Sequence, residues 1–165
     1  MKQERRKIFT NQGFSKTIYA ENFSIDANTN DGSCEYAPLG VLSFENFNYQ
    51  NNTIDVHLNC EYPVSNFEFS IEGLDIVSFG GGASENYNFT IESNNNIIYG
   101  SSNDQTIPAD VGFLLRMTFS EYDETICFEQ STITTYVGIQ YEAILGGCII
   151  PGCIDDTARN YNQNA

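Results

Sequence analysis

The chain has 165 residues, of which 41% are hydrophobic, and a chain of this size buries about 70% of its unfolded surface in one core. Its 22 acidic residues against 7 basic ones give a formal charge of -15, which excludes the basic surface that nucleic acids and anionic membranes require. No apolar run approaches the roughly 20 residues of a membrane-spanning helix. We therefore expect one main domain, with no nucleic-acid partner and no insertion into a membrane.

The first 16 residues differ in charge from the rest. They hold five bases and one acid, for a net charge of +4, whereas residues 17–165 hold two bases and 21 acids, for -19. The basic start resembles that of a signal peptide, but the apolar run of about 7–15 residues that should follow is missing. A basic head thus precedes an acidic body, and secretion has to be inferred from other features.

Composition divides the chain into three zones. Residues 1–40 are polar and rich in Asn, residues 41–148 are rich in apolar side chains, and residues 149–165 form a short polar tail. We predict an N-terminal arm, a folded domain and a C-terminal segment, respectively.

Apolar side chains in the folded domain recur at every second position, which is the period of a β-strand with one buried face. Turn residues such as Gly73, the glycines at 80–82 and Asp123 separate these segments, at close to the spacing typical of a sandwich. We predict an all-β fold, an antiparallel β-sandwich of eight or nine strands with irregular Asn/Asp-rich terminal segments. The expected core comprises Phe44, Val56, Leu58, Phe67, Phe69, Ile71, Phe89, Ile91, Leu115, Met117 and Phe119.

An internal repeat links the two ends of the chain. Residues 20–27 and 158–165 share Ala, Asn and Ala at the same offsets. The first copy continues to Asp31-Gly32-Ser33-Cys34, whereas Gly152-Cys153-Ile154-Asp155 precedes the second. The two copies therefore look like one longer motif that is cut at different points.

This motif resembles the Cys-bounded, Asp/Asn-rich repeat of very large secreted surface proteins, which is distantly similar to thrombospondin type 3 repeats. Its first 14 positions fit residues 152–165 and its latter half fits residues 20–34, although residues 14–17 lack the expected first cysteine and aspartate. The body between the repeats resembles cohesin-like, jelly-roll-like sandwich modules in its segments 64–69, 79–83, 107–109 and 126–128. The resemblance implies an extracellular protein at a cell or virion surface.

Five cysteines without a Cys-x-x-Cys pair favour disulfides in an oxidising compartment over zinc binding or thiol catalysis. Cys127 and Cys148 flank a predicted hairpin, and we expect them to form a disulfide, with two buried reduced thiols as the alternative. Cys60 is expected on the polar face or at the end of its strand, and the sequence assigns it no partner.

Cys34 and Cys153 occupy the last and the first cysteine positions of the repeat, so each lacks a mate in its own copy. The halves add up to one motif, which indicates either a piece of a tandem array or subunits joined head to tail through these two cysteines. The alternative is that both repeats are simply cut short.

Oxygen-bearing side chains precede Gly32 at nearly alternate positions, a pattern that suits Ca²⁺, which takes six to eight oxygen ligands on a sharply turning backbone. The fit to an EF-hand loop is imperfect, because the glycine comes one residue late and no Glu stands at the twelfth position. A second, weaker site is predicted in the tail, and Asx turns are the alternative for both. The predicted ligands are Asp26, Asn28, Asn30 and Asp31, and then Asp155 and Asn160 with Asn162.

Catalytic motifs are weak. His57 is the sole histidine and is expected on the solvent side of its strand, where it has no catalytic role. The carboxylates Glu121, Asp123, Glu124 and Glu129 cluster in sequence; they suit an acidic solvated loop better than the paired acids of a glycosidase. The glycines at 80–82 are expected to connect strands rather than to open a helix that binds phosphate. We predict that the chain is not an enzyme.

These features favour a structural or adhesive module of an extracellular filament or tandem-repeat surface protein that assembles head to tail. Its partners are then copies of itself or neighbouring modules. Residues 7–10 and 17–20 are short β-prone segments that could add a strand to an open sheet edge. The alternative is a glycan-binding module, for which the ten tyrosines offer stacking surfaces although the chain has no tryptophan.

Overall fold

The computed structural model describes residues 5–9, 15–19, 39–154, 156 and 157. In the arm, β1 (Arg5–Phe9) and β2 (Ser15–Tyr19) pair antiparallel from Arg5 with Tyr19 to Phe9 with Ser15. The two β-prone segments of the arm therefore form strands that pair with each other. This arm is less irregular than its composition predicted.

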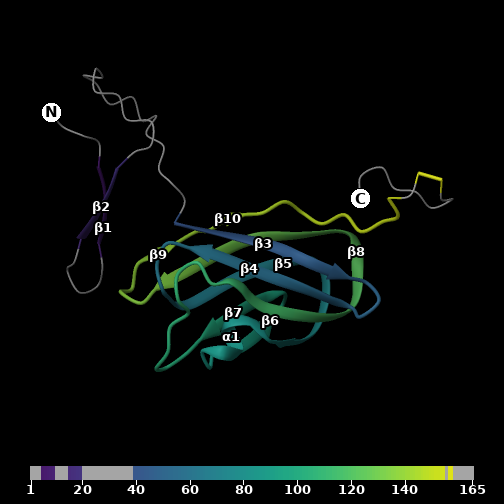
Figure 1. The fold of residues 1–165 in the computed structure, drawn as a ribbon, viewed down its shortest axis with the longest axis horizontal. Helices are drawn as coiled ribbons and strands as arrows, with labels where there is room; N and C mark the ends of the chain where they lie inside the picture. Colours follow the sequence, from purple (N-terminus) through teal and green to yellow (C-terminus); the bar gives the residue numbers. More distant parts are fainter. Residues whose placement is uncertain (1–4, 10–14, 20–38, 155, 158–165) are drawn as a thin grey trace, which may run out of the picture.

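The body is an eight-stranded mixed sheet that folds into a sandwich, which confirms the predicted all-β class (Figure 1). The strand order is β10-β3-β4-β8-β5-β7-β6, and β9 pairs with β8 off this path. All pairs are antiparallel except β10 with β3, which run parallel and depart from the prediction. The strands are β3 (Gly40–Asn48), β4 (Thr53–Cys60), β5 (Val64–Gly80), β6 (Thr90–Asn94), β7 (Ile97–Ser101), β8 (Gly112–Thr135), β9 (Gln140–Tyr141) and β10 (Ile144–Leu145).

Two long strands, β5 and β8, belong to both layers of the sandwich. The first part of β8 pairs with β4 and with the end of β5, whereas residues 127–135 pair with the start of β5 at residues 64–72. The start of β5 also pairs with β7. The layers are therefore continuous through a bend in both strands, where the register shifts several times between residues 70 and 78 of β5.

Gly73 lies at this bend. Its φ is +86°, and a Cβ there would lie 2.1 Å from the carbonyl oxygen of Thr125 on β8. Glycine alone combines this backbone conformation with so close an approach. The turns that Gly73 and Asp123 predicted are wrong, because β5 and β8 bend at these places without ending.

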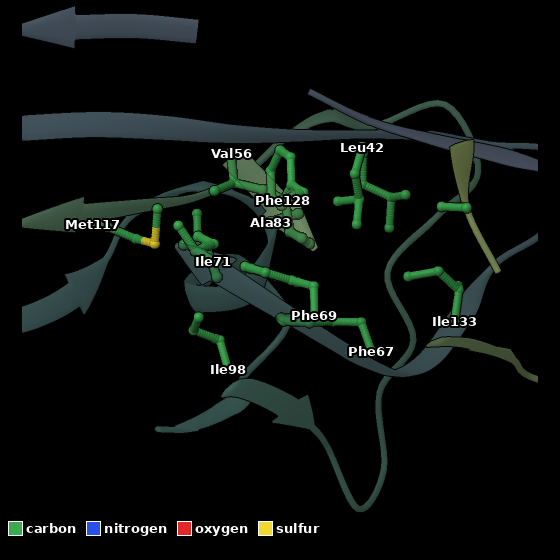
Figure 2. Packing of buried hydrophobic residues seen from close by; sticks show 14 of the residues in the cluster. Leu42, Val56, Phe67, Phe69, Ile71, Ala83, Ile98, Met117, Phe128 and Ile133 are labelled. Carbon is green, nitrogen blue, oxygen red and sulfur yellow. The ribbon is translucent and has the colours of Figure 1, made fainter. Parts of the chain in front are cut away.

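The core lies between the layers and contains the predicted residues. Phe69 and Leu115 are fully buried, and of the eleven predicted residues only Phe44 and Ile91 are partly exposed. Phe44 of β3 stacks on Phe128 of β8 with ring centroids 3.8 Å apart, and Phe69 of β5 contacts Phe128 edge-on at 5.7 Å. Figure 2 shows Phe69 and Phe128, with Phe67 and Val56, gathered between the strands. Period-two alternation therefore identified the buried face correctly.

The glycines at 80–82 do open a helix, contrary to the prediction. The short helix α1 (Gly82–Asn86) starts directly after Gly81, and the Glu85 carboxylate accepts a hydrogen bond from the Gly81 amide at 2.5 Å. A Cβ at Gly82 would lie 2.5 Å from the carbonyl oxygen of Leu114, so the helix packs close against β8. The glycines are required for this contact, and a helix of one turn offers no phosphate site.

Candidate interaction surface

The segment that leaves the sandwich is fastened to the bend of β8. Cys148 and Cys127 form a disulfide with their Cα atoms 4.5 Å apart, as predicted. Directly after it, Ile149 exchanges two backbone hydrogen bonds of 2.9 Å with Ile126. The chain therefore leaves the body from a fixed point on the β8 strand.

A groove with a cavity volume of about 570 Å³ lies beside this exit. One wall comes from Phe47 and Tyr49 at the end of β3, another from Tyr122 in the bend of β8. The third is the exit segment at residues 149–154, which includes Cys153. Rings and aliphatic chains dominate this lining, and among the described residues no acid or amide side chain belongs to it.

The aromatic residues of the groove are held by packing and yet remain open to solvent. Tyr122 meets Phe47 and Phe119 edge-on, with ring centroids 5.4 and 5.7 Å away. Tyr49 is 64% exposed, Tyr122 44% and Ile154 76%. A preformed concave apolar surface of this kind is typical of interaction sites.

Acidic residues surround Tyr122 in sequence. Glu121, Asp123 and Glu124 lie on the same exposed stretch of the β8 bend, as does Thr125. They and Glu129 are all exposed, as expected for an acidic solvated surface. The structure therefore places an acidic strand segment next to the apolar groove.

Sequence reasoning did not single out Phe47, Tyr49 or Tyr122. Two signals were available: Tyr122 lies inside the acidic cluster, and Tyr49 lies two residues before Asn51-Asn52, a pair that is typical of a turn. Neither signal shows that the two segments meet, because Phe47 and Tyr122 are brought together by the bend of β8.

Of the two repeat cysteines, Cys153 is a free thiol of intermediate exposure at the groove. Its predicted partner Cys34 lies outside the described residues. The same holds for the predicted calcium ligands, namely Asp26, Asn28, Asn30, Asp31, Asp155, Asn160 and Asn162. In the part of the chain that the structure does describe, no three His, Cys, Asp or Glu side chains lie together as a metal site would require.

Cys60 is the last residue of β4, which is one of its two predicted positions, and it is buried, so the alternative of the polar face is wrong. Like Leu58 two residues before it, Cys60 is buried. Its thiol donates a hydrogen bond to the Tyr62 carbonyl oxygen at 3.3 Å. Burial raises the pKa of the Cys60 thiol, which keeps it protonated and unreactive. Cys60 is therefore a core residue and a free thiol.

Asp55 is the unexpected feature of the polar face of β4. Arg116 of β8 donates two hydrogen bonds to its carboxylate, Nε to Oδ1 at 2.6 Å and Nη2 to Oδ2 at 2.9 Å, and Asn46 donates a third at 3.0 Å. The hydrogen bonds from Arg116, opposed by burial and aided by Asn46, lower the pKa of Asp55. Asp55 therefore neutralises the charge of Arg116 within the folded chain.

His57 also differs from its prediction. It does lie on the outer face of β4, but its side chain is only 18% exposed. Its ring lies 5.7 Å from that of Phe113, and Nδ1 is 3.6 Å from a carboxylate oxygen of Glu45.

Phe113 and Arg116 also line a second, smaller hollow of about 260 Å³ beside Gly80 and Gly81. Because Asp55 holds Arg116, this hollow offers no free cation to a ligand.

Two solved structures are partly similar to this chain. A cohesin module from a family 33 glycoside hydrolase of Clostridium perfringens is 11% identical, with a TM-score of 0.47 over 69% of this chain and 97% of that module. A non-cellulosomal cohesin from the archaeon Archaeoglobus fulgidus is 14% identical, with a TM-score of 0.44 over 64% and 84%. No family model and no curated protein matches the chain.

Proposed function

We infer that the chain is a non-enzymatic structural module of an extracellular assembly, a filament or tandem-repeat surface protein in which copies join head to tail. The observation that carries this proposal is the exit segment: a disulfide anchors it to β8, and a free thiol at Cys153 follows beside an uncovered apolar groove. A module that transmits force or position to its neighbour needs such a fixed exit.

The compartment fits this proposal. A disulfide between Cys127 and Cys148 forms and persists in oxidising surroundings, which are extracellular for most proteins. Within the described residues, no helix has the length and hydropathy of a membrane span. Acidic and exposed side chains over most of the body are compatible with a solvated surface module.

The test is the mass of the unreduced full chain, followed by peptide mapping of its disulfides. We expect oligomers joined by a disulfide between Cys34 of one copy and Cys153 of the next, and single chains on a denaturing gel after reduction. Cys153→Ser should abolish the linked species, whereas Cys60→Ser serves as the control because that thiol is buried. A chain that remains monomeric at high concentration, with both repeat thiols free, contradicts the proposal.

Calcium is the proposed cofactor of the repeat segments, held by the Asp and Asn side chains named above. A cation that binds only the folded loop raises the melting temperature by mass action. We expect millimolar Ca²⁺ to raise that temperature over chelated protein, and the double substitution Asp26→Ala and Asp31→Ala to remove the rise. Equal melting temperatures with chelator and with Ca²⁺ would leave these loops as Asx turns only.

A glycan-binding module is the second candidate, favoured by the exposed rings of Tyr49 and Tyr122 in a concave groove. Sugars, however, need polar side chains around the stacking ring, and the part of the lining that the structure describes has no acid or amide side chain. Titration of the chain with oligosaccharides decides between the two: binding that Tyr49→Ser abolishes would support the glycan module.

A further inference from the structure

We propose that the groove lined by Phe47, Tyr49 and Tyr122 is the docking site for the basic N-terminal strands β1 and β2 of a second copy of this chain. The proposal rests on the proposed head-to-tail function and names the surfaces that meet. Its two grounds are charge complementarity and the position of the groove at the exit of the chain.

The acceptor side is apolar at its centre, and the segment of β8 that carries Tyr122 is acidic. The lining is mostly apolar, with Tyr49 and Ile154 open to solvent, and exposed acids flank Tyr122 at positions 121, 123 and 124. Between residues 39 and 154 the sequence has 15 acidic residues and a single base, Arg116. Arg116 already forms an ion pair with Asp55, so the body offers a cationic partner only negative charge.

The donor side has the complementary chemistry. β1 has the sequence RRKIF and β2 the sequence SKTIY, so ten residues contain four bases and four apolar or aromatic residues. Within the described residues, β1 and β2 have no strand partner besides each other. A two-stranded sheet is marginally stable by itself in water and gains stability by packing on another surface.

The structure favours docking of β1 and β2 in the groove over addition of one of these strands to the neighbouring edge of β3. β10 pairs only with Val41 and Leu42, so the rest of the β3 edge is open. Beyond these residues, however, β3 has a bulge between Glu45 and Asn48, where its register with β4 shifts. Asn46 in this bulge has a φ of +50° and is bonded to Asp55. Bulges of this kind blunt sheet edges against incoming strands.

The same arrangement brings the repeat cysteines within reach of each other. Cys153 lines the groove, and Cys34 follows the end of β2 at Tyr19 by 15 residues, a stretch that spans at most about 50 Å when extended. Noncovalent docking of β1 and β2 would then precede the proposed disulfide. The groove and the cysteines would thus act on the same junction between copies.

The experiment uses two full-length variants with complementary defects. The donor-defective chain carries Arg5→Glu, Arg6→Glu and Lys7→Glu, and the acceptor-defective chain carries Tyr49→Ser and Ile154→Ser. Both acceptor positions are exposed, 64% and 76%, so these changes should not unfold the body. The matched control is Val77→Ser with Tyr136→Ser, at positions that are 64% and 59% exposed and outside the groove.

Sedimentation of unreduced chains that all carry Cys34→Ser provides the measurement, because this change removes the proposed disulfide between copies and keeps the Cys127–Cys148 disulfide beside the groove. We expect each defective chain alone to be monomeric, with a dissociation constant raised at least 10-fold, and the control to assemble like the unmodified chain. A mixture of the two defective chains should form one-to-one complexes that do not grow, because only one arm and one groove are intact. Raising the salt concentration from about 0.05 to 0.5 M should weaken these complexes.

Other outcomes separate the two proposals. If the acceptor-defective chain assembles as well as the control, or the donor-defective chain as well as the unmodified one, the docking site is wrong and head-to-tail assembly stands. Strand addition at the open edge of β6 would then be the next candidate. If the unmodified chain is monomeric even when unreduced, both proposals fail, and an arm that docks in its own groove becomes the better explanation.

Discussion

The interior near Phe69 and the groove near Tyr122 are both built from aromatic rings, but they differ in what covers them. In the interior, Phe44, Phe69 and Phe128 are packed by both layers of the sandwich. In the groove, Phe47 and Phe119 support the ring of Tyr122 from below, and its outer side faces solvent. Rings of the first kind stabilise the fold, whereas rings of the second kind are available to a partner.

Removal of an interior ring should have the largest effect on stability. Phe69→Ala removes a fully buried side chain and leaves a cavity, so we expect the free energy of unfolding to fall by about 3–5 kcal/mol. Chemical denaturation of the unmodified chain and the variant measures this difference. A loss below about 1 kcal/mol would place Phe69 outside the core and invalidate the comparison.

Loss of the disulfide should have the next largest effect. Cys127 and Cys148 are separated by 21 positions, and closing a loop of this length in the unfolded chain stabilises the fold by about 3 kcal/mol. Cys127→Ser combined with Cys148→Ser should lower the free energy of unfolding by that amount. Denaturation under nonreducing conditions tests it, with Cys60→Ser as a separate control for loss of a buried thiol. A double variant as stable as the unmodified chain would show that the exit segment needs no anchor.

The ion pair of Asp55 should contribute less, because the Arg116 side chain is 50% exposed. We expect Asp55→Ala to destabilise the fold by about 2 kcal/mol, below the range for fully buried pairs.

The stabilisation by the ion pair of Asp55 and Arg116 should depend on pH. Because the pKa of Asp55 is lower in the folded state, its stabilisation is present above the unfolded pKa of about 4 and is lost as the pH falls through the folded value. Denaturation series between about pH 7 and pH 2 should therefore converge for the unmodified chain and Asp55→Asn, and a constant difference would contradict this assignment.

The smallest effect on stability is expected in the groove. Tyr49→Ser should change the free energy of unfolding by no more than about 0.5 kcal/mol, as is usual for exposed positions, and should still weaken assembly. Thermal denaturation and sedimentation of the same sample separate these two properties. A large loss of stability would show that Tyr49 belongs to the packed structure and is not free for a partner.

The sequence alone predicted the interior better than the groove. Period-two alternation is a local property, so it identified Val56, Leu58 and Phe69 as buried residues without knowledge of their partners. The burial of Asp55 depends on its register opposite Arg116, which is 61 residues away in the chain. No local pattern contains that pairing.

The bends of β5 and β8 explain why two of the predicted turns are wrong. Gly73 and Asp123 were correctly recognised as sites where the chain changes direction, but a turn ends a strand, and here both strands continue into the other layer. The groove exists because of this bend, since it brings Tyr122 next to Phe47. The cysteine pair, by contrast, was predictable because Cys127 and Cys148 flank a short chain segment that returns to its start.

The central claim is that copies of this chain join head to tail at the exit groove, and the average molar mass of the unreduced full chain across a concentration series tests it most directly. Light scattering should give a mass that rises with concentration above the 18.5 kDa of one chain, and Tyr49→Ser should suppress this rise while Tyr136→Ser does not. A mass of one chain at every concentration, with free thiols at Cys34 and Cys153, would contradict the account.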